Sequence, residues 1–414
     1  MRDILYHRAL VDAGIVAGGG SGSGITPWRG SGLGVARRMV DTFVEEAGRV
    51  APVARTEHPF LNRRDAYERV FPHYANIYRL RAPEESQPDW VLRADNLHLN
   101  VEWLRQNRHQ GPVVATGGLL RQLRGSGSPL FRERYIWPAV QLNHLVPAGE
   151  GPAALESYRQ VLERTFEAFG LPVLTLATDA LSSYGDVCHL TVTCLRDGRP
   201  TVLATAYLMA APYRRALGVS GDLVDIGFTG KVLALVSMHH LDRGGLGLPS
   251  ALAPVQVGVL APQGAPGLDT WSRSLAGLRT RTVTVAGDVP FRRHRAERGL
   301  VRTGTPLTYG VWPDGTWRVG RRAPSRYAPT TPFPDADTVR AELSGYDRRQ
   351  LDAARTRLRH SVERDGLVRG VCDGCAAAGR VPVFGRIVPH RPARCVHCAA
   401  PGSDHLVSEQ GRFY

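Results

Sequence analysis

The chain has 414 residues and a formal net charge of +14, from 52 lysine and arginine residues against 38 acidic residues. Its length predicts two or three domains rather than one core, and the charge favours an anionic partner such as a nucleotide or RNA. A basic protein without a nucleic-acid role is the open alternative. No window approaches eighteen uncharged apolar residues, and charges are scattered through the first residues, which argues against a membrane span and a secretory signal. We therefore expect a cytoplasmic protein.

The first predicted elements are a loop and two helical stretches. AGGGSGSG at 17–24 has no lysine after it, so a loop is favoured over a phosphate-binding motif. WRGSGLGVARRMVDTFVEEAG at 28–48 has apolar residues at helical spacing and a glycine where a helix would end, which predicts a helix. A second amphipathic stretch, VLRADNLHLNVEWLRQN, lies within 88–110.

Strand patterns begin at residue 112. PVVATGGLL and RERYIWPAVQLNHL flank a basic tip rich in glycine and serine, which predicts an antiparallel hairpin. ALESYRQVLERTFEAFG at 154–170 predicts a helix. VCHLTVTCLRDGRPTVLATAYLM at 187–209 predicts a second hairpin with its turn at Asp197–Gly198. KVLALVSMHH at 231–240 is a buried helix or strand.

The composition changes near residue 250. A Pro-rich turn precedes the apolar strand PVQVGVL, and this strand begins a smaller α/β unit that extends to about residue 325. A Pro-rich linker follows, and then a long charged helical stretch, DTVRAELSGYDRRQLDAARTRLRHSV. We expect one face of that helix to be exposed to solvent.

Four of the six cysteines form two pairs near the C-terminus, CDGC and CVHC. In a reducing compartment, paired CxxC spacing favours a metal over disulfides. Four thiolates at C-x2-C-x19-C-x2-C can complete a tetrahedral zinc site without an open position, which predicts a structural ion. Free thiols are the alternative, and His397 could replace one sulfur. The predicted ligands are Cys372, Cys375, Cys395 and Cys398.

One stretch resembles a known family. The segment at 231–262, KVLALVSMHHLDRGGLGLPSALAPVQVGVLAP, is similar to motif 3 of class II aminoacyl-tRNA synthetases and to the connection between their catalytic and anticodon-binding domains. The similarity is to prolyl-tRNA synthetase of the archaeal and eukaryotic type. In the same order, the segment 28–48 resembles the motif 1 helix, 132–137 the end of motif 2, and 201–219 a segment that ends in a Tyr-Leu pair. The resemblance covers about 25–414.

The resemblance implies an α+β fold with a class II synthetase antiparallel sheet flanked by helices. A small α/β anticodon-binding-like domain and a C-terminal zinc-type domain follow, and that family ends in an aromatic tyrosine, as Phe413–Tyr414 do here. The expected parts are an N-terminal segment (1–24), a catalytic domain (25–250), an anticodon-binding-like domain (251–325), a linker and helix (326–365) and the four-cysteine domain (366–414).

The resemblance also implies an activity. The family is a ligase of protein biosynthesis that uses ATP and Mg²⁺ to form an aminoacyl-adenylate and transfers the amino acid, here proline or a relative, to tRNA. Such a site positions its reactants and neutralises developing charge. Arg121 matches the motif 2 arginine and Lys231 falls at the motif 3 arginine, so both are implied to be catalytic; together with Arg132 they would bind ATP. Pairing through residues 28–60 would give a homodimer.

The substrate side departs from the family pattern. Asp95, Trp137, Gln141 and Tyr207 fall in the implied substrate pocket, but Asp95 replaces a threonine and Gln141 a histidine. Leu123 stands where the family has the glutamate that holds the adenine amine. Lost charged partners of this kind weaken binding. Two alternatives therefore stay open: a tRNA-independent ligase that activates a different acid, or a degenerate synthetase paralogue that binds tRNA or a protein partner.

Overall fold

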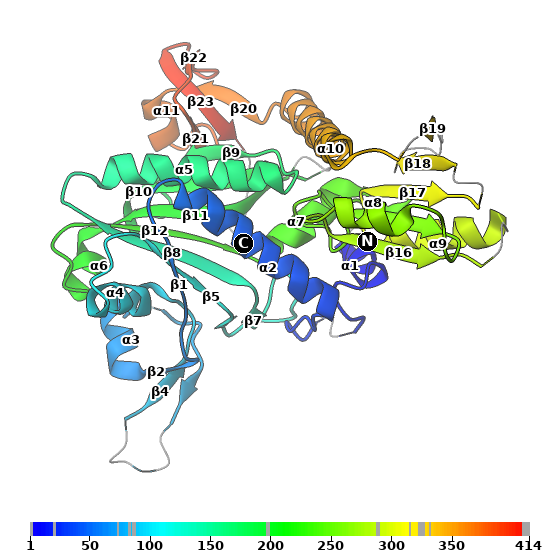
Figure 1. The fold of residues 1–414 in the computed structure, drawn as a ribbon. Helices are drawn as coiled ribbons and strands as arrows, with labels where there is room; N and C mark the ends of the chain where they lie inside the picture. The colour runs from blue at the N-terminus through cyan, green and yellow to red at the C-terminus, as the bar shows by residue number, and fades with distance from the viewer. Residues whose placement is uncertain are drawn as a thin grey trace.

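A computed structural model describes residues 3–19, 22–72, 74–81, 84, 88–195, 199–286, 290–313, 316–321, 328–330 and 333–407. The fold is α+β, with a large mixed sheet flanked by helices, a smaller mixed sheet, and a four-cysteine cluster (Figure 1). The sequence prediction is confirmed at this level. Among the described residues, no helix has the length and apolarity to cross a bilayer. The predicted turn at Asp197–Gly198 and the terminal Phe413–Tyr414 lie outside the described residues.

The large sheet has eleven strands. β1 is parallel to β5, and every other neighbouring pair is antiparallel. The order is β1 (Ala54–Glu57), β5 (Val113–Thr116), β8 (Ala139–Val146), β12 (Asp222–Thr229), β11 (Pro200–Met209), β10 (Gly185–Cys194), β9 (Leu174–Ala177), β21 (Val383–Val388), β23 (Pro401–Val407) and β20 (Val368–Val371), with β22 (Pro392–Arg394) beside β23. Both predicted hairpins are present, as β5 with β8 and β10 with β11.

One face of this sheet is apolar and covered by helices. The helices α2 (Gly30–Gly48) and α5 (Gly151–Ala168) pack across it (Figure 1). In β12, Val224, Ile226 and Phe228 belong to this core, and the ring of Phe43 lies 5.2 Å from that of Phe228. Side chains alternate between the two faces of a strand. The residues between these three must therefore face the opposite side of the sheet.

Two further helices pack against each other. α7 (Lys231–His240) is a helix, which decides between the two predicted alternatives. α1 (Asp3–Asp12) packs against it, and Ser237 donates a hydrogen bond to the carbonyl of Tyr6 at 3.3 Å. The Tyr6 hydroxyl donates to the carbonyl of Pro129 at 2.6 Å. The N-terminal segment is thus built into the main core, and it supports the loop between residues 121 and 134.

A small subdomain extends from the open face of the sheet, at the lower end of Figure 1. Its buried residues include Tyr67, Phe71 and Leu97, and they pack against Met209 of β11. The subdomain thereby covers one end of that face. Its elements are β2 (Leu61–Arg63), α3 (Arg64–Val70), β3 (Arg79–Leu80), β4 (Trp90–Leu92) and α4 (Leu97–Gln106), with α6 (Ala211–Ala216) and the pair β6 (Leu119–Leu120) and β7 (Tyr135–Ile136) nearby.

The second unit is a five-stranded mixed sheet. β15 (Val257–Ala261) is parallel to both of its neighbours, β16 (Thr280–Thr284) and β17 (Leu307–Val311). The remaining elements are β18 (Trp317–Arg321), β19 (Ala328–Thr330), α8 (Leu268–Ser274) and α9 (Pro290–Arg302), and a short pair, β13 (Leu241–Asp242) with β14 (Gly245–Leu246), precedes them.

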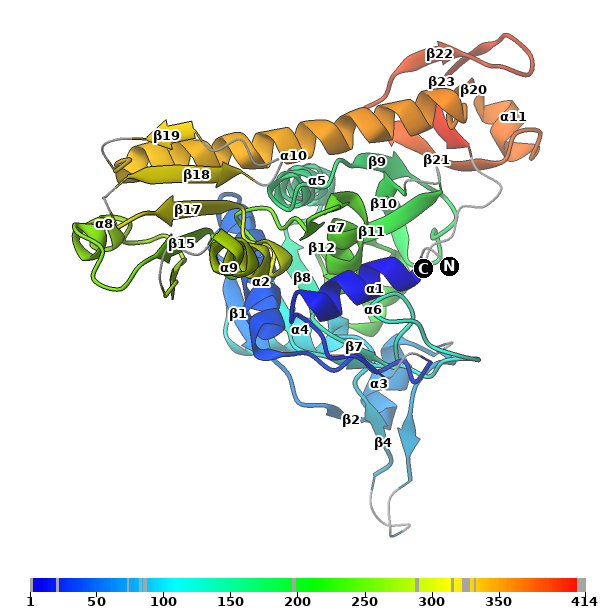
Figure 2. The same ribbon diagram turned by 90° about the vertical axis from the view of Figure 1, so that its right-hand side faces the viewer.

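The helix α10 (Ala336–Arg364) connects the two sheets (Figure 2). It begins after Asp335, whose carboxylate accepts a hydrogen bond from the Thr338 backbone N–H at 2.7 Å, a typical N-cap. Near its start, Val339 and Leu343 complete the core of the small sheet. Near its end, Arg357 donates to the carbonyl of His239 at 2.8 Å. The helix is therefore part of both cores rather than a free connection.

The C-terminal unit is joined to the large sheet. β21 pairs with β9, with Ile387 opposite Leu176. Phe384, Ile387 and Leu406 share a buried cluster with Leu176 and Leu190. A short helix, α11 (Asp373–Ala377), carries part of the cysteine cluster. Because hydrogen bonds and apolar packing both cross this boundary, we expect folding of the unit to be coupled to that of the large sheet.

Candidate functional site

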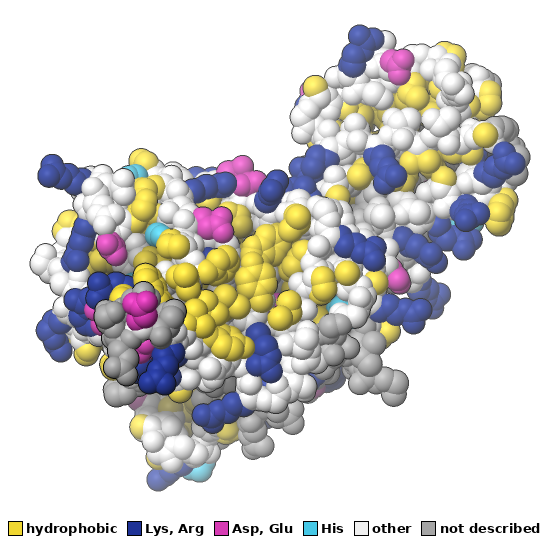
Figure 3. Space-filling view, turned by 90° about the horizontal axis from the view of Figure 1, so that it is seen from below, with side chains coloured by type: hydrophobic (Ala, Val, Ile, Leu, Met, Phe, Trp, Pro, Cys, Tyr) yellow, Lys and Arg dark blue, Asp and Glu magenta, His cyan; other side chains and the backbone are white. Residues whose placement is uncertain are grey.

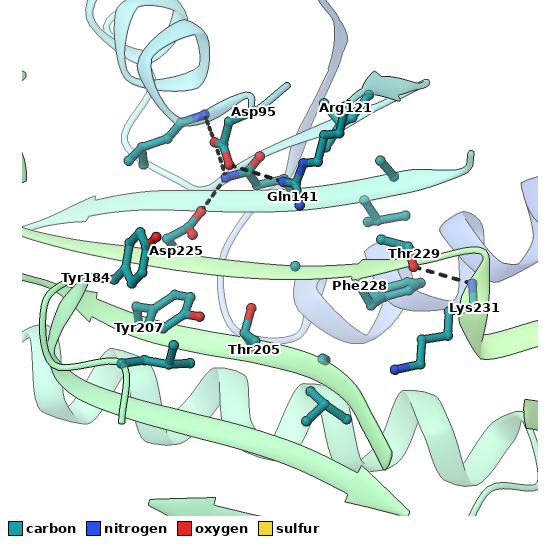
Figure 4. A pocket seen from close by; sticks show the side chains of 18 of the residues that line it. Asp95, Arg121, Gln141, Tyr184, Thr205, Tyr207, Asp225, Phe228, Thr229 and Lys231 are labelled. Carbon is teal, nitrogen blue, oxygen red and sulfur yellow. Dashed lines mark hydrogen bonds and ion pairs between the residues drawn. The ribbon is translucent and has the colours of Figure 1, made fainter. Parts of the chain in front are cut away.

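A cavity of about 660 Å³ lies on the open face of the large sheet, on β8, β11 and β12. These three strands form the floor of the cavity, and their register determines which residues lie side by side on it. Gly227 lies between Gln141 on one side and Thr205 on the other, and Asp225 lies beside Tyr207. Because Gly227 has no side chain, the centre of the floor stays open to a ligand. Five of the residues predicted from the sequence line this cavity (Figure 4): Asp95, Arg121, Gln141, Tyr207 and Lys231.

One end of the cavity holds two carboxylates linked by an amide. Gln141 Nε2 donates to Asp95 Oδ1 at 3.0 Å and to Asp225 Oδ1 at 2.8 Å. The orientation of Gln141 is fixed because its Oε1 accepts from the Asn96 backbone N–H at 2.9 Å. Asn143 Nδ2 donates to the same oxygen of Asp225 at 2.7 Å. This acidic pair, Asp95 and Asp225, can bind a cation.

The second carboxylate of the pair is easily protonated. Burial, together with the neighbouring charge of Asp95, raises the pKa of Asp225 to about 7. The hydrogen bonds from Gln141 and Asn143 act in the opposite direction. A positive charge placed beside Asp225 would favour its ionised form.

Arg121 lies next to the acidic pair. Its Nε and Nη2 both donate to the carbonyl of Ala94 at 3.1 Å, and its Nη2 lies 3.9 Å from Asp95 Oδ2. The guanidinium also lies 5.5 Å from the ring centroid of Tyr74. Nη1 makes no hydrogen bond within the described part of the chain, so it is available to an anionic ligand.

Lys231 marks the other end of the cavity (Figure 4). It is the first residue of α7 and is 9% exposed. Its ammonium lies 5.6 Å from the ring centroid of Phe131, and burial lowers the pKa of Lys231 to about 8. Among the described residues, no carboxylate lies within ion-pair distance of it. A buried ammonium without a counter-charge is suited to an anion such as phosphate or carboxylate.

Two of the predicted site residues lie away from the cavity. Trp137 was predicted as a substrate-pocket wall, but its ring packs edge-on against Trp28, with centroids 4.7 Å apart. Arg132 was predicted to bind ATP, but its exposed guanidinium donates to the carbonyl of Arg124. Neither residue lines the cavity, because each side chain is held by a neighbour outside it.

The structure adds residues that the sequence analysis did not single out. Asp225, Tyr184 and Tyr74 line the acidic end. The ring of Tyr184 lies 6.3 Å from that of Tyr207, and burial raises the pKa of Tyr207. A signal for Asp225 was present in the strand DLVDIGFT, where this charged residue lies between the apolar residues Val224 and Ile226.

The four predicted zinc ligands come together in the C-terminal unit. The sulfur atoms of Cys372, Cys375, Cys395 and Cys398 all lie within 4.8 Å of one another. Cys398 Sγ lies 3.6 Å from Cys372 Sγ and 3.7 Å from Cys375 Sγ. A tetrahedral zinc with Zn–S bonds of about 2.3 Å separates its sulfurs by roughly 3.8 Å, whereas a disulfide needs about 2.0 Å. The cluster therefore fits a structural metal ion such as zinc.

The four thiols of this cluster do not share one electrostatic environment. Backbone N–H groups of Cys372 and Cys398 lower the pKa of Cys395 to about 6, whereas burial and the neighbouring thiols raise the pKa of Cys375. Cys375 and Cys395 are buried, whereas Cys398 is exposed. Within the described residues, His397 is not part of the cluster. All four ligands are cysteines, so no position is left open for catalysis.

Comparison with protein-family models found no match for this chain. A search of curated proteins found no match either.

Proposed function

We propose that this chain is an adenylate-forming ligase of the class II aminoacyl-tRNA synthetase type, which activates proline or a related amino acid with ATP and transfers it to tRNA. One observation carries the proposal: a single cavity on an antiparallel sheet holds an acidic pair at one end and two cationic groups, Arg121 and Lys231. An amino acid needs a site for its ammonium, and ATP needs positive charge at its phosphates.

The residues can be assigned roles in this reaction. The amino-acid carboxylate attacks the α-phosphorus of ATP, an acyl–phosphate bond forms, and pyrophosphate leaves. Asp95 and Asp225 would hold the ammonium and so orient the carboxylate towards the phosphate. Arg121, fixed on the carbonyl of Ala94, and Lys231 would neutralise charge on the phosphoryl oxygens. Mg²⁺ supplies further positive charge when it is bound with the ATP phosphates.

The donor set limits where Mg²⁺ can bind. Mg²⁺ prefers carboxylate and water oxygens. In the described part of the cavity, the two carboxylates are at the ammonium end and none lies beside Lys231. The ion would therefore be held by phosphate oxygens and water rather than by a protein cage.

Basic surface supports tRNA as the partner. On α9, four arginines are exposed, and Figure 3 shows basic side chains over the small unit at its right. Such clusters attract the phosphates of RNA. The exposed residues are Arg292, Arg295, Arg298 and Arg302.

The proposal is tested by ATP–pyrophosphate exchange over a panel of amino acids, with and without tRNA. Exchange with at least one amino acid, followed by its attachment to tRNA, is expected. Exchange without attachment to any tRNA would instead favour a tRNA-independent ligase.

One observation favours a second candidate, a degenerate synthetase paralogue that only binds tRNA or a protein partner. Leu123 offers no hydrogen bond to adenine, and it does not line the cavity. A methyl group added at the Cα of Gly24 would lie 2.8 Å from Leu123 Cδ1, so Leu123 packs against that backbone instead. Complete absence of exchange, with tRNA binding retained, would support this candidate.

A further inference from the structure

We propose that the acidic end of the cavity binds an organic cation, an alkylammonium or guanidinium group in the side chain of the substrate, so that the acid activated is a cationic amino acid rather than proline. The inference rests on the ligase activity proposed above, and it replaces proline with a cationic amino acid as the substrate of the same cavity. It is argued from the free oxygens of the acidic pair, from the rings around it, and from Lys231 opposite.

The acidic pair has acceptors that the protein leaves unused. Both Oδ1 atoms accept from Gln141, which is 7% exposed and holds the carboxylates in place. Asp225 Oδ2 accepts no hydrogen bond from any described residue, and Asp95 Oδ2 has Arg121 at 3.9 Å. Two carboxylates face the ligand. Arg121 lies 3.9 Å from Asp95 but is shared with the ATP phosphates in the proposed reaction, so the pair can accept two positive charges from the ligand: an α-ammonium supplies one, and a cationic side chain would supply the second.

The surroundings favour an organic cation over a metal ion. Tyr74, Tyr184 and Tyr207 line the same end of the cavity, and Figure 4 shows Tyr184 and Tyr207 beside Asp225. Aromatic rings attract alkylammonium and guanidinium groups by cation–π interaction. Calcium and magnesium ions would instead have to complete six or more oxygen ligands largely with water, and the tyrosine rings supply none of the carboxylate or carbonyl oxygens that they prefer.

Lys231 indicates that the ligand also carries a negative group. Its side chain is 9% exposed, has no carboxylate partner among the described residues, and points into the cavity at the end opposite the acidic pair (Figure 4). A ligand that satisfies both ends has an anionic group towards Lys231 and a cationic group towards Asp95 and Asp225. A cationic amino acid, joined through its carboxylate to phosphate, has this arrangement.

Isothermal titration calorimetry of the full chain without ATP tests the inference. The probes are L-arginine and L-lysine, with L-citrulline, L-norleucine and L-proline as neutral counterparts. We expect one of the cationic amino acids to bind at least about tenfold more tightly than every neutral one, as for a charge-assisted contact. Asp225→Asn should reduce that affinity at least about tenfold. Asp269→Asn, the same change at an exposed site of α8, should leave it unchanged.

Two results would overturn the inference: neutral amino acids that bind as tightly as the cationic ones, or an Asp225→Asn variant with unchanged affinity. If Asp225→Asn does not fold, the probe series on the unaltered chain still decides. Failure of the proposed function can be distinguished from failure of this inference. Cation binding without pyrophosphate exchange would contradict only the ligase activity, and exchange with proline without cation selectivity would contradict only this inference.

Discussion

Asp225 places an ionisable side chain on the open face of the large sheet, which its neighbours in β12 do not. Val224 and Ile226 on either side belong to the core, whereas Asp225 lies in the cavity. The groups that face it are Asp95 across Gln141, the amide of Asn143 and the phenol of Tyr207. A single substitution at Asp225 should therefore change both binding and pH dependence.

The first prediction concerns stability against pH. The pKa of Asp225 is about 7 in the folded chain and about 3.9 when unfolded, so the folded state binds the proton more tightly. The stability that this proton contributes is present in acid and is lost as the pH rises towards 7. Asp225→Asn should match the unaltered chain to within about 0.5 kcal/mol at pH 4, close to the unfolded pKa, but be more stable by roughly 1–3 kcal/mol at pH 8, with the shift discounted for partial exposure.

Denaturant unfolding at the two pH values checks this difference. Asp269→Asn serves as the control and should follow the unaltered chain at both. An Asp225→Asn variant that is less stable than the unaltered chain at pH 8 would mean that the native carboxylate is ionised and stabilising.

The second prediction concerns the cysteine cluster. Purified protein should contain close to one zinc per chain, and Cys395→Ser should lower this content because a thiolate ligand is lost. Cys188→Ser should retain the metal, since Cys188 is a buried cysteine outside the cluster. Metal analysis after dialysis measures both. Full zinc content in a Cys395→Ser, Cys398→Ser double variant would refute the ligand assignment.

At the scale of elements, local patterns predicted more than long-range pairings did. The helix at 28–48 and the hairpin at 187–209 follow from apolar periodicity and turn residues, and both are present. The pairing of β21 with β9 joins residues about two hundred positions apart, and no local pattern encodes such a contact. The sequence predicted a separate C-terminal zinc-type unit, but not that its strands would extend the large sheet.

The third prediction tests this extension. Ile387 is 2% exposed and packs with Leu176 across the junction of the two strands. Ile387→Ala should therefore destabilise the chain by about 2–4 kcal/mol, and it should lower the unfolding midpoint of the large sheet as well as that of the cysteine unit. Val396→Ala is the control, because Val396 is 57% exposed and should change stability by less than about 0.5 kcal/mol.

Circular dichroism and zinc release, followed together during denaturation, measure the effect. Coincident transitions that shift together in Ile387→Ala are expected. A shift confined to zinc release would show that the C-terminal unit folds independently of the large sheet.

At the scale of the whole molecule, the sequence analysis singled out several residues that line the cavity. Five residues of the cavity come from segments far apart in the chain: Asp95, Arg121, Gln141, Tyr207 and Lys231. The resemblance located these residues along the sequence, because the motifs follow one another in the same order as the strands near which they lie. It could not place Trp137, whose contact with Trp28 depends on packing of the chain's first segments. It also missed the partner of Asp95 in the acidic pair, which is defined by the register of β8 and β12.

The fourth prediction concerns assembly. We propose a homodimer through residues 28–60, and this region exposes the apolar side chains of Leu33, Val50 and Phe60. Arg55 pairs with Asp41 within the chain at 2.8 Å, so its charge is balanced at that surface. Light scattering at micromolar concentration should give twice the 45.2 kDa of one chain. Only monomer at that concentration would contradict the proposal.

The central claim is that the cavity forms an acyl-adenylate, and pyrophosphate exchange with a matched pair of arginine variants tests it most directly. Arg121 lines the cavity and Arg132 does not, although the sequence implied ATP binding for both. With the amino acid that supports exchange, Arg121→Ala should reduce the rate more than about a hundredfold, the effect of roughly 3 kcal/mol on a charged transition state. Arg132→Ala should retain most of the rate. Exchange that is absent with every amino acid, or that Arg121→Ala leaves unchanged, would contradict the account.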